Sequence, residues 1–350
     1  MHRNQLDPPT RPAVMARPEG KTMKSIVQDR YGPAPEDVLR LAETDRPTIR
    51  RDEVLVKVHA ASVDRGTWHV MAGLPYPIRL AGFGLRRPKY ANPGRALAGT
   101  VEAVGADVTG VEPGDEVFGI GSSSFAEYAR AHADKLAPKP TNLSFGQAAA
   151  VPISGLTALQ AVRDQARVGP GQKVLIVGAS GGVGTFAVQI AKAYGAEVTA
   201  VCSASKTTLV SALGADQVID YTRADVADGT IRYDVILDIA GNRRLSHLRR
   251  ALAPRGRLVI VGSETDGRWL GGMDRQLRAQ LLSPFIGQTL GTFIASENSQ
   301  DLITIRELIE SGKVTPAIDG TYPISDVSAA IHHMLNGRAR GKLVISVQPT

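Results

Sequence analysis

Cysteine is nearly absent from this sequence. The single one, Cys202, excludes an internal disulfide and a metal site built from several cysteines, and it fits a reducing compartment such as the cytoplasm. Long apolar runs are missing too. None approaches the ~20 residues that span a bilayer, so we expect a soluble, cytoplasmic protein with no membrane partner. Aromatic residues make up only 5% of the chain, which gives little sign of a stacking pocket for flat ligands.

Positive charge is in excess but is not organised into a nucleic-acid surface. The formal net charge is +7, yet the basic residues are scattered along the chain. One cluster alternates with apolar residues, as on the solvated face of a helix, and it consists of Arg243, Arg244, Arg249, Arg250, Arg255 and Arg257. We therefore expect no nucleic-acid partner.

The pattern of apolar residues divides the 350 residues into a tail and two domains. Residues 1–22 mix Pro, Arg and polar residues without apolar periodicity, so we predict a flexible tail. Residues 23–152 contain short alternating segments such as EVLVKVHA, which are typical of an antiparallel, barrel-like β domain. Residues 153–289 contain short apolar runs separated by helix-length segments, the pattern of a buried parallel sheet. Residues from about 290 to 350 end in a helix and a strand that we expect to complete the first domain.

A glycine-rich loop joins a strand to a helix inside the second domain. In VLIVGASGGVG, the glycines allow a close backbone approach where free N–H groups and the helix dipole can hold a pyrophosphate. A strand before the loop, an amphipathic helix after it and a second strand behind provide the context that a dinucleotide site requires. The residues predicted to contact the cofactor here are Ala179, Ser180, Gly181, Gly182, Val183 and Gly184.

The end of the following strand indicates which dinucleotide binds. NAD sites place a carboxylate there, which would repel a 2′-phosphate, but VTAVCSASK contains no acidic residue. Ser203 and Ser205 can donate hydrogen bonds to a phosphate, Lys206 adds a positive charge, and Tyr221 can supply another hydroxyl. We therefore predict NADPH as the cofactor. The alternative is that Lys206 is merely a solvated lysine in the first turn of a helix.

Several long motifs in order carry a family resemblance, which extends roughly from residue 23 to the end. They are PGDEVFGI, SFAEYARAHADKLAPKP, LSFGQAAAVPISGLTALQAV, GQKVLIVGASGGVG, LGADQVIDY, YDVILDIAGN and GKLVISV. The chain resembles the medium-chain dehydrogenase/reductase superfamily, specifically its zinc-independent quinone oxidoreductase (zeta-crystallin-like) branch. The resemblance implies an α/β fold with a Rossmann doubly wound parallel sheet and a GroES-like β-barrel catalytic domain. It also implies an active site in the cleft between them and a homodimer formed through the edge of the Rossmann sheet.

The resemblance also bears on metal binding. The positions that match the zinc ligands of related alcohol dehydrogenases are Asp64, Arg95 and Ile153. A cationic arginine and an aliphatic chain cannot complete a three-ligand site, so we expect no zinc. Without a Lewis acid, reduction of an activated acceptor is easier than oxidation of a simple alcohol.

Residues near the nicotinamide are likewise assigned by resemblance. Thr157 matches a threonine that lies beside the nicotinamide in relatives, and Ser154 is added to the same cofactor set. Gly262 and Ser263 match the strand end that meets the carboxamide. An alternative role for Thr157 is to cap a helix.

The segment SVDRGTWHVMAGLPYP departs most from the family pattern. Asp64 and Thr67 replace an asparagine and an aspartate, which rearranges the polar groups predicted to face the substrate. His69 occupies the position of a relay histidine and could pass a proton, or it is a packing residue. Tyr76 could donate to a substrate oxygen or anchor a loop. With Thr157, these four residues are the predicted catalytic set.

The predicted activity is transfer of hydride from NADPH to a small-molecule quinone or α,β-unsaturated carbonyl compound, without zinc. In such a reaction the protein mainly orients the reactants and excludes water. One alternative is an NAD(P)-dependent alcohol dehydrogenase. Another is a non-catalytic NADPH-binding sensor or interaction protein that keeps the fold without turnover.

Overall fold

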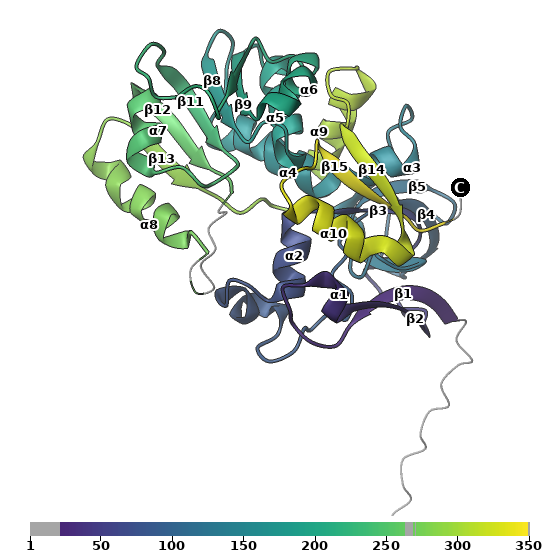
Figure 1. Cartoon of the computed structure of the whole chain (residues 1–350). Coiled ribbons are helices and arrows are strands. Elements are labelled where there is room, and N and C mark those ends of the chain that lie inside the picture. The colour runs from purple at the N-terminus through teal and green to yellow at the C-terminus, as the bar shows by residue number, and fades with distance from the viewer. Residues whose placement is uncertain (1–21, 263–268, 270, 349–350) are drawn as a thin grey trace, which may run out of the picture.

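The chain forms two lobes joined along one side (Figure 1). This computed structural model describes residues 22–262, 269 and 271–348. The tail predicted for residues 1–22 lies outside the described residues except for Thr22. That residue begins the first strand and pairs with Asp45, so the predicted boundary is one residue too late.

One lobe is built on a six-stranded parallel sheet. The strand order is β10-β9-β8-β11-β12-β13, which confirms the predicted doubly wound arrangement. The four central strands are buried because their short apolar runs are covered by side chains on both faces. Their bounds are β8 Lys173–Val177, β9 Glu197–Cys202, β10 Gln217–Asp220, β11 Tyr233–Asp238, β12 Leu252–Ile260 and β13 Thr289–Thr292.

Helices cover this sheet and connect its strands. The helix after β8 buries the predicted apolar face, including Ala187 and Ile190, and Gly195 follows it with a φ of +82°. The helices of this lobe are α4 Pro152–Gln160, α5 Gly182–Ala193, α6 Thr207–Ala212, α7 Leu245–Ala251, α8 Met273–Leu282 and α9 Ser299–Glu310. Shorter helical turns are η3 Ala161–Gln165, η4 Ala204–Lys206 and η5 Ser283–Phe285.

The other lobe is a seven-stranded sheet that curls around its own core. Its order is β14-β15-β3-β4-β5-β7, with β6 also paired to β3, and a separate ribbon joins β1 to β2. Val54, Val56 and Val58 alternate along β3 and are all fully buried, as their spacing predicts. The strands are β1 Thr22–Gln28, β2 Leu39–Asp45, β3 Glu53–Val63, β4 Ala96–Val104, β5 Glu116–Ile120, β6 Tyr128–His132, β7 Leu136–Pro138, β14 Ile318–Pro323 and β15 Lys342–Ser346. The helical segments are α1 Pro35–Val38, α2 Arg65–Ala72, η1 Arg79–Phe83, η2 Ala133–Lys135, α3 Phe145–Ala149, η6 Ile324–Asp326 and α10 Val327–Leu335.

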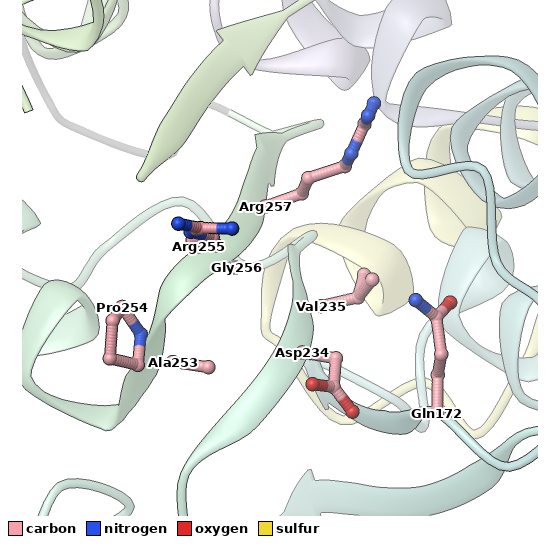
Figure 2. Close-up of a pocket in the computed structure, with 8 residues that line it drawn as sticks. All are labelled: Gln172, Asp234, Val235, Ala253, Pro254, Arg255, Gly256 and Arg257. Atoms are coloured by element: carbon pink, nitrogen blue, oxygen red, sulfur yellow. The ribbon is translucent and has the colours of Figure 1, made fainter. Parts of the chain in front are cut away.

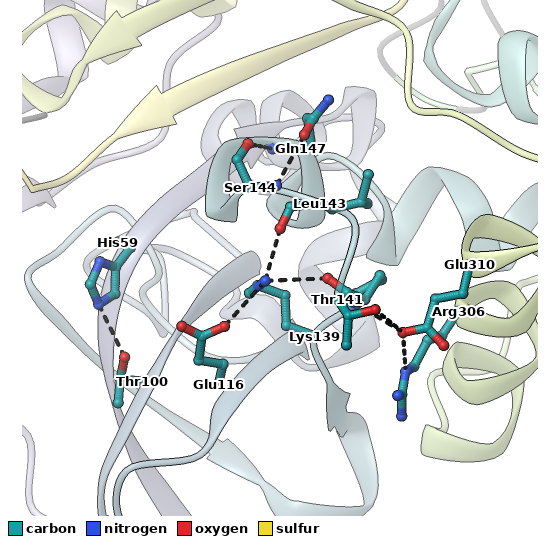
Figure 3. A network of polar contacts seen from close by, with 11 residues as sticks. His59, Thr100, Glu116, Lys139, Thr141, Leu143, Ser144, Gln147, Arg306 and Glu310 are labelled. Carbon is teal, nitrogen blue, oxygen red and sulfur yellow. Dashed lines mark hydrogen bonds and ion pairs between the residues drawn. The ribbon is translucent and has the colours of Figure 1, made fainter. Parts of the chain in front are cut away.

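The end of the chain lies in the lobe with the seven-stranded sheet, because β15 pairs antiparallel with β3. The parallel sheet itself extends to Thr292, so we propose a domain boundary after that residue rather than at 289. A polar network also joins the lobes behind the sheet (Figure 3). There Glu310 of α9 accepts hydrogen bonds from the Thr141 N–H at 3.0 Å and from Arg306 at 3.0 Å.

Candidate functional site

The glycine loop lies between β8 and α5 and is shaped by two glycines in particular. Gly178 has a φ of +85°, so it makes the tight turn that most residues avoid. A Cβ on Gly184 would collide with the Gly178 carbonyl oxygen. The position that needs glycine at the start of the loop is therefore Gly178, and Ala179, which is fully buried, fits beside it without strain. Ala179 keeps the first position of the fingerprint spacing, and Gly178 just before it is a loop residue that the sequence reasoning missed.

The first turn of α5 presents backbone donors at this loop. Gly181 is the N-cap residue, and Gly182, Val183 and Gly184 form the first turn, whose N–H groups have no partner within the helix. A Cβ on Gly181 would approach only the Gly178 carbonyl oxygen, at 3.6 Å, so the outer side of the loop is open. This cradle fits the diphosphate of a dinucleotide.

Lys206 lies at the other end of the predicted cofactor groove and is held by the backbone of a distant segment. Its Nζ donates to the carbonyl oxygens of Gly337 at 2.8 Å and Ala339 at 2.9 Å. Burial lowers the pKa of Lys206, and the charge of Arg340 acts in the same direction, although Asp319 opposes both. The solvated-lysine alternative is therefore wrong, and Arg340 is a neighbouring cation that the sequence reasoning missed.

The other predicted phosphate contacts surround the carboxyl end of β9. Ser203 lies beside Ser205, with the two Oγ atoms 3.4 Å apart, and Tyr221 is half exposed at the end of the neighbouring strand. An acidic residue, Asp220, is also present at this edge, in register with Cys202. Its Oδ1 accepts hydrogen bonds from the Thr222 N–H and hydroxyl, which lower the pKa of Asp220, and its Oδ2 lies 3.7 Å from Arg223.

The predicted nicotinamide contacts Thr157 and Gly262 are both partly buried. Thr157 is half-buried and lies within α4, where its Oγ1 donates to the Ile153 carbonyl oxygen at 2.8 Å. The capping alternative for Thr157 is therefore wrong. Gly262 follows β12, and a Cβ there would collide with the Ile239 carbonyl oxygen. Ser263 lies outside the described residues.

Asp64 and Ser154 meet in the interior, together with a lysine that the sequence reasoning missed. Ser154 donates to Asp64 Oδ1 at 2.9 Å, and Lys342 of β15 forms an ion pair with the same carboxylate. All three side chains are more than nine-tenths buried. Thr67 is also buried, and its Oγ1 accepts from the Asp64 N–H at 3.3 Å, so it supports the start of α2 rather than facing a substrate. A lysine within an otherwise apolar strand is the signal that could have identified Lys342.

The residues at the family's zinc positions are engaged elsewhere. Arg95 pairs with Glu297 at 2.8 Å, and Lys135 binds the same carboxylate at 2.9 Å. Within the described part of the chain, no group of three His, Cys, Asp or Glu residues is arranged to hold a metal ion. The donor set found here does not fit a three-ligand zinc site.

Two of the predicted catalytic residues lie in α2 and in the loop that follows it. His69 donates its Nδ1 hydrogen to the Leu74 carbonyl oxygen at 2.7 Å, which holds this loop against the helix. Tyr76 packs edge to face against Trp269, with ring centroids 5.1 Å apart, and Arg79 lies over its ring. Trp269 belongs to the segment between β12 and α8, so the Tyr76 contact bridges the two lobes.

A buried ion pair anchors α8 beside the predicted nicotinamide end. Asp238, at the carboxyl end of β11, is fully buried and pairs with Arg275. Burial raises the pKa of Asp238, although the guanidinium of Arg275 and the Gly241 N–H favour its ionised form. The backbone carbonyl of Asp238 accepts from the Gly262 N–H at 3.2 Å. The pair therefore fixes the strand end where a carboxamide would bind.

A separate pocket of about 380 Å³ lies at the amino ends of the strands of the parallel sheet, opposite the glycine loop (Figure 2). Gln172 precedes β8 and Asp234 lies at the start of β11, so this pocket is at the amino ends of the strands. The glycine loop follows the carboxyl end of β8. Because ligands of such folds bind at the carboxyl ends, this pocket is not the candidate site.

Comparison with known proteins connects this geometry to a family. Residues 50–141 match the family model described as an alcohol dehydrogenase GroES-like domain, and residues 213–345 match one described as a zinc-binding dehydrogenase. The chain is 32% identical to a Mus musculus protein named NAD(P)H oxidoreductase RTN4IP1, mitochondrial, across 97% of this chain and 93% of that one. It is 33% identical to a 2-methylene-furan-3-one reductase of Solanum lycopersicum, across 93% of this chain and 80% of that one.

A solved structure of an oxidoreductase has the same fold as this chain. The quinone oxidoreductase from Coxiella burnetii superimposes with a TM-score of 0.79 at 31% identity, across 94% of this chain and 100% of that chain. Fold and site therefore define an oxidoreductase with a GroES-like lobe and a Rossmann lobe. The chain belongs to the medium-chain dehydrogenase/reductase superfamily, in its zinc-independent quinone oxidoreductase branch. Among the described residues, no helix is long and apolar enough to cross a membrane.

Proposed function

We propose that this protein is an NADPH-dependent reductase that transfers hydride to a quinone or an α,β-unsaturated carbonyl compound without a catalytic zinc. The observation that carries the proposal is the loop between β8 and α5. There a Cβ at Gly184 has no room and the first helical turn offers N–H groups to a diphosphate. The names of the mouse, tomato and Coxiella relatives support a reductase that uses a nicotinamide cofactor.

The preference for NADPH rests on the charges at the adenosine end. Lys206 and Arg340 interact electrostatically, and Ser203 with Ser205 adds two hydroxyl donors nearby. A 2′-phosphate placed here would relieve the repulsion between the two cations and gain charge-assisted hydrogen bonds. Asp220 ends β10 rather than β9, where the ribose-binding carboxylate of NAD sites is expected, and its Oδ1 accepts hydrogen bonds from Thr222.

Most of the chemistry would come from the cofactor. When bound, the reduced nicotinamide supplies the hydride, and the protein orients the acceptor against it and excludes bulk water. Thr157 and Gly262 would hold the nicotinamide end, while Tyr76 closes the side of the cleft near Trp269. A proton would then come from solvent. The engagement of Arg95 with Glu297, and of Asp64 with Lys342, supports a reaction without metal.

We also propose that the protein forms a homodimer through the open edge of the parallel sheet. β13 is one of the two edge strands of this sheet, and large apolar side chains are exposed on α8 and around β13. These are Met273, Leu277, Leu281, Phe285 and Ile294. Pairing two copies at this edge would cover both the unpaired backbone groups and these side chains. Sedimentation analysis should give twice the chain mass, and a monomer across all concentrations would contradict the proposal.

The activity is tested by mixing the purified protein with NADPH and a panel of quinones and enones. Rapid loss of the absorbance of the reduced nicotinamide supports the reductase. Tight NADPH binding without consumption would indicate the sensor function instead. Oxidation of a secondary alcohol that requires added metal would indicate an alcohol dehydrogenase. Metal analysis should find less than one zinc per chain, whereas a full equivalent that resists chelation would overturn the zinc-free mechanism.

A further inference from the structure

A charged side chain is buried at the junction of the two lobes, where an apolar one would be expected. Lys342, the first residue of β15, is 2% exposed. Its Nζ donates to the Val63 carbonyl oxygen at 3.0 Å and to Ser154 Oγ at 3.2 Å, and it pairs with Asp64. We refer to the three side chains as the buried trio: Lys342, Asp64 and Ser154.

The buried trio collects segments that are far apart in the sequence. Asp64 ends the connection from β3 to α2, Ser154 lies in the first turn of α4, and Lys342 begins β15. Asp64 and Lys342 are 278 residues apart in the chain, and Ser154 and Lys342 are 188 residues apart. The contacts therefore fix three segments from both lobes relative to one another.

The same cluster touches the glycine loop. A Cβ on Gly182 would lie 3.0 Å from Lys342 Cδ and 3.2 Å from Ser154 Oγ. The residue before Lys342 is tied to the loop as well, because the Gly341 N–H donates to the Ser180 carbonyl oxygen at 2.9 Å. The buried trio thus lies directly against the first turn of α5, where the cofactor is proposed to bind.

Stability alone does not explain a buried ion pair at this place. Moving both charges out of water costs about as much as their attraction returns, and a packed apolar pair is often equally stable. What a hydrogen-bonded ion pair adds is a defined geometry, because each donor must meet its acceptor. A defined geometry matters most where the cofactor lobe and the acceptor lobe meet, since hydride transfer depends steeply on distance.

We propose that Lys342 is a positioning residue for hydride transfer. Through Asp64 and Ser154 it fixes the start of α2 and the start of α4 against the first turn of α5. An acceptor bound by the catalytic lobe then meets the nicotinamide at transfer distance. This inference rests on the proposed reductase function, but it concerns the alignment of the two lobes and not cofactor affinity.

The decisive variant removes both charges together. K342M alone leaves Asp64 as an uncompensated buried charge and is expected to destabilise the fold, so D64N/K342M is the variant that tests function. We expect it to fold and to bind NADPH with a Kd within about threefold of the original. Its kcat should fall by up to about 10²-fold, the effect of a displacement near 1 Å, with a larger primary isotope effect from 4-deuterated NADPH. A kcat within threefold, or a Kd that rises in parallel with the loss of kcat, would overturn the proposal.

A second buried lysine provides a matched control. The Lys139 side chain is 8% exposed and pairs with Glu116 at 3.2 Å, within the network of Figure 3 and away from the glycine loop. E116Q/K139M should therefore keep the original kcat. If the unmodified protein does not oxidise NADPH with any quinone or enone of the panel, the proposed function fails. The positioning role is then tested by amide hydrogen exchange at Gly181–Gly184. Faster exchange in D64N/K342M than in E116Q/K139M supports it, and equal exchange overturns it.

Discussion

The two ends of the proposed site are built by different means. At the cofactor end, the loop from Gly178 to Gly184 uses backbone groups, and its shape depends on the absence of side chains. At the acceptor end, side chains from distant segments meet, as Tyr76 meets Trp269 and Asp64 meets Lys342. The first end is local in the sequence, and the second exists only after both lobes have packed.

This difference has a consequence for substitutions. A site made of backbone tolerates changes at most of its side chains but fails when a Cβ is added at a close approach. A site made of side chains loses affinity or rate in proportion to each contact removed, and it depends on how its neighbours are held. The two ends should therefore respond to mutation with effects of different size and kind.

The largest effect is expected at Gly184. A Cβ there collides with the Gly178 carbonyl oxygen, which belongs to the same loop, so G184A must displace either the turn or the helix. We expect NADPH affinity to fall more than about 100-fold, since a loop shifted away from the diphosphate loses several charge-assisted hydrogen bonds. At Gly169, a Cβ would meet nothing within 4 Å, so G169A is the control. Equal dissociation constants for the two variants, measured by fluorescence titration, would contradict a loop shaped by close approach.

The cofactor end could be predicted from the sequence because its signals are local. The apolar runs, the glycines and the helix periodicity all lie within about 30 residues, the length of one βαβ unit. The fingerprint spacing i, i+2, i+5 places Ala179, Gly181 and Gly184 in the loop, but it does not include Gly178, whose positive φ makes the tight turn just before them. A backbone turn outside the fingerprint leaves no mark in that spacing, so its position emerges only from the folded loop.

The acceptor end could not be predicted in the same way. Periodicity identifies a strand such as Lys342–Ser346, but it does not state which side chain from another lobe will meet its first residue. Asp64 and Thr67 were expected to face a substrate, and both are buried: Asp64 pairs with Lys342, and Thr67 supports a helix start. Long-range pairing is decided by packing of whole lobes, and only the unusual lysine in an apolar strand gives a local sign of it.

The next largest effect is expected at Lys206, one of the two cations on which the proposed NADPH preference rests. K206E replaces a cation near the proposed 2′-phosphate by an anion, so NADPH affinity should fall at least about tenfold. NADH lacks this phosphate and should lose less than threefold. The same charge change at the exposed Lys313 should alter neither affinity. Equal losses for NADPH and NADH in calorimetric titration would reject the assignment of the cofactor.

A smaller effect is expected at Tyr76, which joins the lobes at the acceptor end. Y76A removes the ring that packs against Trp269 at 5.1 Å, and an aromatic pair contributes about 0.5–1.5 kcal/mol beyond its buried area. We expect the KM of the acceptor to rise by about three- to tenfold, with the Kd of NADPH unchanged. Y76F keeps the ring and should resemble the unmodified protein. If Y76F is as impaired as Y76A, the hydroxyl acts on the substrate and the contact is not only packing.

The smallest effect on either end is expected behind the sheet, where α4 and α9 are joined by Asp301. Its carboxylate accepts from Arg163 at 2.8 Å, from Gln160 at 2.8 Å and from Asn298 at 3.2 Å. D301N should lower the free energy of unfolding by about 1–3 kcal/mol, because it weakens charged hydrogen bonds in a buried place. Asp164, a more exposed partner of the same arginine, offers the matched control D164N, which should cost less than about 1 kcal/mol. Neither variant should change the KM of the acceptor or the Kd of NADPH at neutral pH.

The pH dependence of unfolding tests whether Asp301 stabilises the contact between α4 and α9 through its charge. Burial by itself would raise the pKa of Asp301, but the hydrogen bonds from Arg163, Asn298 and Gln160 outweigh it and hold the pKa below its ordinary value. The stabilisation is therefore complete above the ordinary carboxyl pKa of about 3.9 and is lost as the pH falls through the lowered value. Urea unfolding of the unmodified protein and D301N should differ by a constant amount from pH 7 to pH 5, and the difference should shrink below about pH 4. A difference in unfolding free energy that stays constant down to pH 3 would show that Asp301 contributes by packing and not by its charge. The contact between α4 and α9 would then resemble the cofactor end, whose shape does not depend on charged side chains.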